Sequence, residues 1–425
     1  MSRKDEDIEF QAQVAAWLFD KMHFKQEQIA EHLGIRQPDV SRRLKLAEER
    51  GWLSRPVFLR GKDISDDRLD EIENAFYQKL PDLRAGIERL SRQRRPADPP
   101  PKVQVFYSGP TATDKAGYHK RQQMFGWNAA LYLRELVPRM HRVGVAWGKT
   151  IARLIDGLGP LQPRFTRGTQ FFPVSGEPLR AHGEENSATT LAAGLQAFVG
   201  GTASDVPGLN MVIPCIPDLF SDDVTRQIKH SLLGQVEGYR RIFLGASGAA
   251  GGGSGNSGPG QQRLIDQMDT LITGVGTASK TSTDPWLIER VNAMHNTPAL
   301  TREDFEAYTF GDIAGVYLLR PRLSEIIAAR NARTPGLSGK ALRELNATVE
   351  AKVKRINSQW TGIQREHVAG CAERARVSGQ TAGVIVLAIG RAKSETVIEA
   401  VNQSLVNHLL IDQDLADALV DDLRA

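Results

Sequence analysis

Apolar residues recur with helical spacing at the start of the chain. Within residues 8–22 the apolar side chains fall on one stripe, formed by Val14, Trp17, Leu18 and Met22. The next segment places Ile29, Ala30 and Leu33 on the inner face of a short helix. We therefore expect two amphipathic helices in this part of the chain.

A tight turn is expected after the short helix, followed by another helix. Gly34 suits the left-handed backbone conformation that ends a helix, and Ile35 can fill the angle between the two helices. Gln37 is expected as the N-cap, Pro38 in the first turn, and Gly51 at the end. The inward residues share a helical period: Val40, Leu44 and Ala47.

The outward face of this later helix is polar and basic, as in recognition helices that lie in the major groove of DNA. We predict a helix-turn-helix over roughly residues 26–50, within a DNA-binding domain spanning residues 1–62. Residues 51–61 form an extended segment compatible with a small wing. A helical hairpin with a solvated basic face is the alternative. The predicted DNA contacts are Gln37, Arg42 and Asp39 near the bases, and Ser41, Arg43 and Lys45 nearer the backbone.

The distribution of charge supports this interpretation more than the total does. The whole chain of 425 residues carries a net charge of only +4. Residues 36–60 contain seven basic and three acidic side chains, so this segment alone has a net charge of +4. A local basic face is what contacts with DNA phosphates require.

The rest of the chain predicts an α/β domain spanning residues 63–425. Residues 66–91 are expected to be helical with a break at Pro81, and residues 92–101 to be an exposed proline-rich loop. Beyond it strands alternate with helices, which indicates a largely parallel sheet covered on both faces. The expected strands are 103–107, 142–146, 170–174, 211–215, 241–244, 270–273, 384–389 and 408–411.

One ligand-binding turn is expected where the strand at 143–145 meets the next helix. Backbone N–H groups at the helix start would attract a phosphate, with Lys149 adding a charge, Thr150 a hydroxyl and Gly148 space. Only three residues separate Gly144 from Gly148, too few for a nucleotide-binding P-loop. An ordinary strand-to-helix turn is the alternative.

Three further turns carry candidate ligand-binding residues. Asp269 precedes a strand that ends at Gly274, Asp312 lies between glycines, and Lys393 follows a strand. Aspartates can accept hydrogen bonds from sugar hydroxyls, and a lysine can neutralise a phosphate. The alternatives are cap or turn roles for the aspartates and a solvated charge for the lysine. The glycine-rich residues 245–262 are expected to form a surface insertion.

The composition excludes several classes of protein. Cys215 and Cys371 lie far apart without a CxxC pattern, which argues against a disulfide framework or a zinc site and favours the cytoplasm. The charged N-terminus lacks the apolar core of a signal peptide, and no apolar run reaches the ~18 residues of a membrane span. We expect no metal, no cofactor and no membrane partner.

Taken in order, these segments resemble the SorC family of sugar-responsive bacterial transcription regulators. The resemblance covers nearly the whole chain, and VGVAWGKT and the final segment are its most specific parts. It runs from IAEHLGIRQPDVSRRLKLAEERG through VGVAWGKTI, FFPVSGEP, MDTLITGVGTA, FGDIAGVYL and TPGLSGKALREL to VIVLAIGRAKSETVIEAVNQSLVNHLLIDQDLADAL.

The resemblance implies a Rossmann-like effector domain, built like sugar-phosphate isomerases and CoA-transferases. It implies a sugar, sugar phosphate or polyol as effector, operator DNA as partner, and a homo-oligomer, often a tetramer or dimer of dimers. The anionic end of the effector would be held by Gly144, Trp147, Gly148, Lys149 and Thr150. The rest of the pocket would be lined by Asp269, Gly274, Asp312 and Lys393.

The chain also departs from the family pattern. Glu177 follows Gly176 where the family often has a second glycine, and residues 245–262 and 351–380 look like surface insertions. These departures leave open an unphosphorylated polyol or no ligand at all.

We interpret the chain as a regulator and not an enzyme. The alternative is a sugar-phosphate isomerase or deaminase with an appended DNA-binding segment, which would need a carboxylate and a histidine in the pocket. His182 and Glu184 are the candidates, but their polar surroundings are more typical of an exposed turn. No catalytic residue is predicted.

Overall fold

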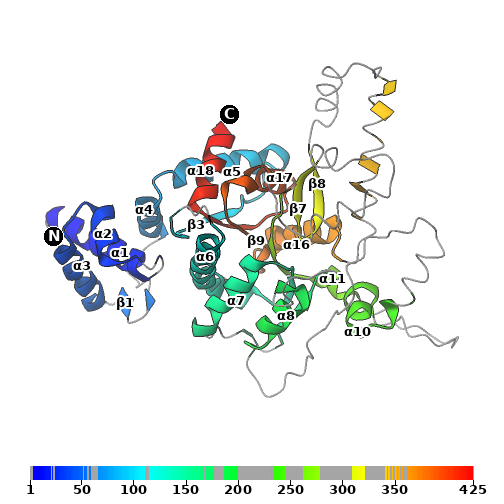
Figure 1. The fold of residues 1–425 in the computed structure, drawn as a ribbon, viewed down its shortest axis with the longest axis horizontal. Coiled ribbons are helices and arrows are strands. Elements are labelled where there is room, and N and C mark those ends of the chain that lie inside the picture. Colours follow the sequence, from blue (N-terminus) through cyan, green and yellow to red (C-terminus); the bar gives the residue numbers. More distant parts are fainter. Residues whose placement is uncertain are drawn as a thin grey trace.

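The computed structural model consists of an N-terminal helical region and a larger α/β domain built on a parallel sheet (Figure 1). This division agrees with the predicted helical N-terminus and α/β C-terminal part. The structure describes residues 3–20, 22, 24–50, 52–54, 57–58, 66–110, 114–161, 163, 165–166, 168–176, 186–199, 231, 233–245, 262–277, 309–320, 362–424 and, in part, 340–357.

The N-terminal helices follow the predicted apolar periods. They are α1 (Arg3–Asp20), α2 (Gln26–Leu33) and α3 (Gln37–Glu49). Gly34 ends α2 with φ of 63°, in the left-handed region as predicted. The expected inward residues of α3 are buried. The N-cap of α3 is Arg36 and not Gln37, which is instead the first helical residue.

Short strands and further helices lead from this region into the α/β domain. The antiparallel strands β1 (Leu53–Ser54) and β2 (Val57–Phe58) lie in the segment expected to be extended. They are followed by α4 (Asp66–Phe76) and α5 (Leu80–Arg94). The helical break lies before Pro81 and not at it, because Pro81 occupies the first turn of α5, where its missing N–H costs nothing.

The sheet has six parallel strands in the order β3-β10-β9-β6-β4-β5. All residues of β9 and β10 are buried, as expected for strands covered on both faces. The strands confirm six of the predicted positions to within one or two residues. They are β3 (Lys102–Phe106), β4 (Arg142–Val145), β5 (Gln170–Pro173), β6 (Thr270–Gly274), β9 (Gly383–Ala388) and β10 (His408–Asp412).

The direction of the chain through the sheet reverses between β4 and β6. From β4 the chain passes to β5 at one edge, whereas from β6 it continues through β9 to β10 in the opposite direction. In open α/β sheets, ligands bind at the carboxyl ends of the strands at such a reversal. The loops that begin after Val145 and after Gly274 therefore flank the position where the topology favours a ligand.

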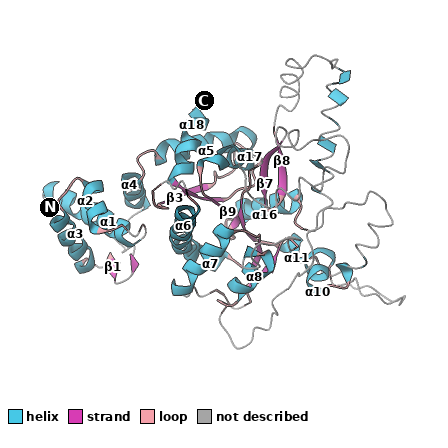
Figure 2. Cartoon of the chain, viewed as in Figure 1, coloured by secondary structure: helices cyan, strands magenta, loops and turns pink. Residues whose placement is uncertain are grey.

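Helices cover both faces of the sheet, with the strands between them (Figure 2). On one face α6 (Lys115–Leu136) packs on α7 (Lys149–Leu161). On the other face α5 packs against α17 (Ser394–Asn402) and α18 (Gln413–Arg424) (Figure 1). The other described elements are η1 (Val137–Arg139), α8 (Ala188–Gln196), α10 (Glu237–Tyr239), α11 (Leu264–Gln267), β7 (Thr309–Ile313), β8 (Val316–Leu319), α16 (Arg365–Ser378) and η4 (Arg391–Lys393).

One predicted strand is wrong. Residues 241–244 belong to a π-helical stretch, η3 (Arg240–Leu244), in which Ile242 and Phe243 are buried. A short apolar run has too few residues for its period to distinguish a strand from a buried helical turn. The predicted strand at 211–215 lies outside the described residues.

The predicted insertion at 351–380 is also corrected in part. Its later half forms α16, which packs on β9 and β6 and buries Val368, Cys371, Ala372 and Ala375. This segment therefore covers the sheet and is not a surface insertion. Residues 92–94 of the expected loop 92–101 belong to α5, and residues 95–97 are exposed. Most of the predicted insertion 245–262 lies outside the described residues. Among the described helices, none is both long and apolar enough to span a bilayer.

Candidate functional site

The exposed face of α3 presents several of the predicted DNA-binding residues, and Asp39 pairs with two of its arginines. The Asp39 carboxylate lies 3.1 Å from Nε of Arg36 and 3.4 Å from Arg42. The side chains of Arg36 and Arg42 remain 81% and 69% exposed. Lys45 is also exposed and lies 3.9 Å from Glu49. The exposed guanidinium groups are therefore held on the surface of α3 by the Asp39 carboxylate.

Gln26, the first residue of α2, organises the start of α3. Its Oε1 accepts a hydrogen bond from Nε2 of Gln37 at 3.2 Å and another from Oγ of Ser41 at 2.7 Å. Two predicted DNA-contacting side chains are thus oriented by one residue of the preceding helix. The sequence gives no signal for this role of Gln26, because a polar residue at the start of a helix is ordinary and its contact with α3 depends on how the two helices pack.

Arg43 differs from the other predicted contacts. Its Nε donates a hydrogen bond to Oε1 of Gln11 on α1 at 3.1 Å, in a half-buried position. This side chain therefore ties α3 to α1, and the structure does not place it with the exposed face of Arg42.

The loop after β4 forms one side of the candidate effector site. Gly148 has φ of +139°, which an L side chain rarely adopts, and no atom would lie within 4 Å of a Cβ there. Its N–H donates to the carbonyl of Asn186 at 3.0 Å. The expectation that this amide faces a ligand is therefore wrong. Lys149 is exposed, Trp147 is half-buried and Thr150 is buried at the first turn of α7.

Two buried hydroxyls lie beside this loop. Ser175 follows β5 and is fully buried, and Thr189 lies in the first turn of α8 with 9% of its surface exposed. Their Oγ and Oγ1 atoms have no hydrogen-bond partner among the described residues. The α8 start adjoins the β4 loop through the bond between Gly148 and Asn186. Buried hydroxyls are normally satisfied, so both are candidates for contact with a polar ligand or water.

The other side of the site is built from β6, β7 and α17. The N–H of Gly276 donates to the carbonyl of Asp312 at 3.0 Å, which brings the end of β6 onto β7. The Asp312 carboxylate is buried and accepts from the N–H of Gly315 at 2.8 Å. A Cβ on Gly311 would lie 2.8 Å from Oγ1 of Thr396, so β7 also approaches α17 closely. Gly274 ends β6, as predicted, and lies on this side of the candidate site.

Lys393 belongs to the turn between β9 and α17. It ends η4 and is the N-cap of α17, and its backbone N–H donates to Gly390 at 3.2 Å. Since β9 adjoins β6, the structure places this turn on the same edge as Gly274. We call the following residues the carboxyl-edge group: Trp147, Gly148, Lys149, Thr150, Ser175, Thr189, Gly274, Asp312 and Lys393.

Two predicted effector residues do not belong to this group. The Asp269 carboxylate accepts from the N–H groups of His141 and Arg142 at 3.2 and 2.8 Å, at the opposite, amino edge of the sheet. It lies about 16 Å from the carboxyl edge, at about 3.3 Å per strand residue. Gly144 lies within β4, where a Cβ would come within 2.3 Å of Met268. Both residues serve the packing of the sheet.

A buried charge cluster at the same edge had no counterpart among the predicted sites. Arg121 on α6 lies 2.6 Å from Asp412 and 2.7 Å from Asp414, and Asp412 is fully buried. Burial raises the pKa of Asp412, while the N–H groups of Gly390 and Leu415 and the guanidinium of Arg121 oppose that shift. The sequence signal was a single aspartate that ends an otherwise apolar strand, which also fits an ordinary turn residue.

Within the described residues, no group of three or more His, Cys, Asp or Glu side chains could hold a metal ion. The glutamate and histidine of the enzymatic alternative, at 184 and 182, lie outside the described residues.

Comparisons with known proteins found one curated relative and several solved structures that are similar to this chain. No protein-family model matches the chain. The chain is 28% identical over 198 residues to the deoxyribonucleoside regulator of Bacillus subtilis (strain 168), over 47% of this chain and 52% of the relative. The match thus spans about half the length of that curated relative.

Solved structures similar to this chain are also regulators. The full-length sorbitol operon regulator SorC from Klebsiella pneumoniae matches at 16% identity with a TM-score of 0.47, over 98% of this chain and 99% of that one. A DeoR family transcriptional regulator from Listeria monocytogenes matches at 15% identity with a TM-score of 0.44, over 80% and 98%. A putative sugar-binding domain of a transcriptional repressor from Vibrio fischeri matches at 13% identity with a TM-score of 0.45, over 81% of this chain and 99% of that one.

Proposed function

We propose that this protein is a transcription regulator whose affinity for operator DNA is set by a small metabolite bound at the carboxyl edge of the sheet. The α2–α3 pair acts as the helix-turn-helix, with β1 and β2 as a small wing. The α/β domain is Rossmann-like and binds the effector. The working form is a homo-oligomer in the cytoplasm, a tetramer or dimer of dimers, whose paired recognition helices fit repeated half-sites.

One observation carries the effector site more than any other. The carboxyl-edge group gathers at the reversal of strand order between β4 and β6, and it includes the unpartnered buried hydroxyls of Ser175 and Thr189. Hydroxyls of this kind suit the oxygen atoms of a sugar, polyol or phosphate. Lys149 and Lys393 supply positive charge, and the Asp312 carboxylate is an acceptor for a sugar hydroxyl.

The DNA-binding half of the proposal depends on α3. Arg36 and Arg42 are largely exposed on the face that carries Gln37 and Ser41. Arginine forks and amide groups on one helix face are the groups that contact guanine and adenine edges in the major groove.

Regulation follows if the effector prefers one arrangement of the oligomer. A ligand can shift an equilibrium only by its difference in affinity for the two states. The bound state would then hold the recognition helices at a different separation and thereby change operator affinity.

A ligand screen followed by DNA binding tests the proposal. Thermal unfolding is measured with deoxyribonucleosides, sugar phosphates, sorbitol and inorganic phosphate, since a specific ligand raises the apparent stability. An operator is then selected from random duplexes, and its affinity is measured with and without each stabilising ligand.

We expect one compound to stabilise the protein and to change the operator affinity. Replacing both Lys149 and Lys393 by alanine is expected to abolish the ligand effect while the unliganded protein binds DNA as before. Arg42→Ala is expected to reduce DNA affinity and leave ligand binding intact. A ligand response that survives both lysine changes would place the effector elsewhere, and unchanged DNA affinity in Arg42→Ala would refute the assignment of α3.

A further inference from the structure

The N-terminal helices rest on the α/β domain at Tyr107, the first residue after β3. The Tyr107 ring meets Phe24 edge-on, with the ring centroids 4.6 Å apart. Its backbone N–H lies 3.4 Å from Sδ of Met22, and its hydroxyl accepts a hydrogen bond from Gln28 at 3.5 Å. Tyr107 thus contacts both α2 and the segment that leads into it.

The residue after Tyr107 belongs to the buried charge cluster. Oγ of Ser108 donates to Oδ2 of Asp412 at 3.2 Å and accepts from Arg121 at 3.1 Å. The carbonyl of Tyr107 accepts from Asn128 of α6 at 2.9 Å, so the backbone here is held by the same helix that carries Arg121. The position of Tyr107 therefore depends on how Arg121 and Asp412 are arranged.

The other oxygen of Asp412 reaches the turn that carries Lys393. Oδ1 accepts from the N–H of Gly390 at 3.0 Å and from the N–H of Leu415 at 3.1 Å. Gly390 has φ of +93° and begins the turn that ends at Lys393. One buried carboxylate therefore joins the edge of the proposed effector site to the residue beside Tyr107.

Arg121 bridges two carboxylates of the cluster. Its guanidinium contacts Asp412 and Asp414 at nearly equal distances, 2.6 and 2.7 Å. A small displacement of Asp412 would leave Arg121 paired with Asp414, so the guanidinium keeps a partner while the bond to Ser108 weakens. Coupling between distant sites needs an element with two alternative states, and this change of partner would supply one.

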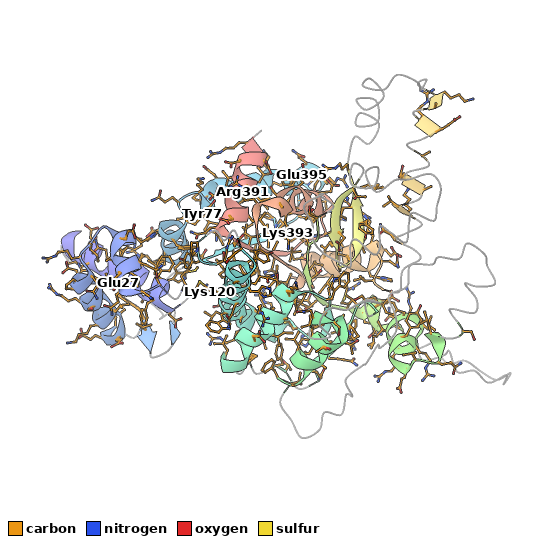
Figure 3. The ribbon with its side chains drawn as sticks, viewed as in Figure 1. Glu27, Tyr77, Lys120, Arg391, Lys393 and Glu395 are labelled. Carbon is orange, nitrogen blue, oxygen red and sulfur yellow. The ribbon has the colours of Figure 1, made fainter. Side chains whose placement is uncertain are left out.

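We propose that Asp412 transmits the occupancy of the effector site to the DNA-binding helices, through Gly390 on one side and Arg121, Ser108 and Tyr107 on the other. This inference rests on the proposed function of the carboxyl-edge group. A ligand that draws the Gly390–Lys393 turn away from Asp412 releases the Ser108 segment and loosens the contact between Tyr107 and Phe24. Figure 3 shows Lys393 within the α/β domain and Glu27 on the N-terminal helices. A change at the effector site therefore has to act through the α/β domain to reach the DNA-binding helices.

The test uses the full chain without DNA or effector and measures amide hydrogen exchange. Gly390→Ala strains the turn at its positive φ, and no atom lies within 4 Å of the new Cβ, so the change acts on the backbone alone. Gly379→Ala is the matched control, because Gly379 also has a positive φ and open space but lies before β9, at its other end.

We expect Gly390→Ala to speed exchange of residues 22–34 by about threefold or more, and Gly379→Ala to leave it at the wild-type rate. Asp412→Asn is expected to speed exchange of the same segment. Because the two changes act in series, the double variant is expected to match Asp412→Asn alone. If Asp412→Asn does not fold, Ser108→Ala replaces it, since Ser108 joins the cluster on the side of the N-terminal helices. The double variant of Gly390→Ala and Ser108→Ala is then expected to match Ser108→Ala alone.

Two results would overturn the proposal. One is faster exchange around residue 390 in Gly390→Ala with residues 22–34 unchanged. The other is an additive effect of Gly390→Ala and the second variant. Neither readout needs DNA or a metabolite, so failure of the proposed function and failure of this inference are distinguishable.

Discussion

Ser41 on α3 donates its hydroxyl proton to Oε1 of Gln26 on α2 over 2.7 Å. Gln37 donates to the same oxygen, so one amide fixes two side chains of the proposed recognition surface. These two hydrogen bonds join the start of α3 to the start of α2, so the polar surfaces of the two helices hold a fixed position relative to each other.

Gln26→Ala is expected to weaken specific operator binding about tenfold, equal to about 1.4 kcal/mol, because Gln37 and Ser41 lose their common acceptor. Competition with non-specific DNA at fixed salt measures the effect. Gln123→Ala, the same change on the exposed side of α6, is the control. Equal loss of specific and non-specific affinity would show that Gln26 acts through phosphates and does not orient α3.

Gly34→Ala is expected to destabilise the N-terminal helices by about 1 kcal/mol or more, because φ of 63° is unfavourable for an L side chain. Nothing lies within 4 Å of the new Cβ, so the loss comes from backbone strain alone. Gly194→Ala in α8 has no positive φ, meets only Ile155 at an ordinary contact distance of 3.5 Å, and is expected to be neutral or stabilising. Denaturant unfolding compares the two, and equal effects would contradict the explanation.

Asp269→Asn separates sheet stability from effector binding. The native carboxylate accepts from the N–H groups of His141 and Arg142 and from Oγ1 of Thr270, and an amide has only one acceptor atom. We expect the free energy of unfolding to fall by about 1–3 kcal/mol while the affinity of the folded protein for its ligand is unchanged. A weakened ligand affinity, measured by calorimetry below the unfolding transition, would show that Asp269 contributes to effector binding.

His408 is expected to make stability depend on pH. Burial, with Lys102 and Arg139 nearby, lowers its pKa from 6.5 to about 3, and Nδ1 shares a 2.8 Å hydrogen bond with the hydroxyl of Tyr132. The unfolded chain therefore binds a proton more readily than the folded one. The stabilisation is complete above pH 6.5 and is lost progressively as the pH falls toward 3, by up to about 1.4 kcal/mol per unit.

Denaturant unfolding of the wild type and of His408→Gln at about pH 7.5 and about pH 5 measures this contribution. The glutamine variant lacks the titrating imidazole, so its stability is expected to fall less between the two conditions. Parallel losses in both proteins would assign the pH dependence to other groups.

Local patterns determined much of this protein. The periods of apolar residues located α1, α2 and α3, and Gly34 marked the turn because only the local backbone conformation is involved. The alternation of strand-like and helical segments located the sheet strands, and β9 has the apolar run expected of a strand buried on both faces. The carboxyl ends of parallel strands lie at one edge of the sheet, and this rule predicted that the loop after β4 and the turn at Lys393 lie at the same edge.

The tertiary structure decided which residues meet. Asp269 and Gly274 are close in sequence, yet one strand separates them onto opposite edges, and only the position of the strand within the sheet shows this. Arg43 and Arg42 are neighbours, but the helix turns one toward α1 and leaves the other exposed. Arg121 and Asp412 are separated by 291 residues and pair only because β3 lies beside β10. Such contacts depend on how distant segments pack, which local periodicity does not encode.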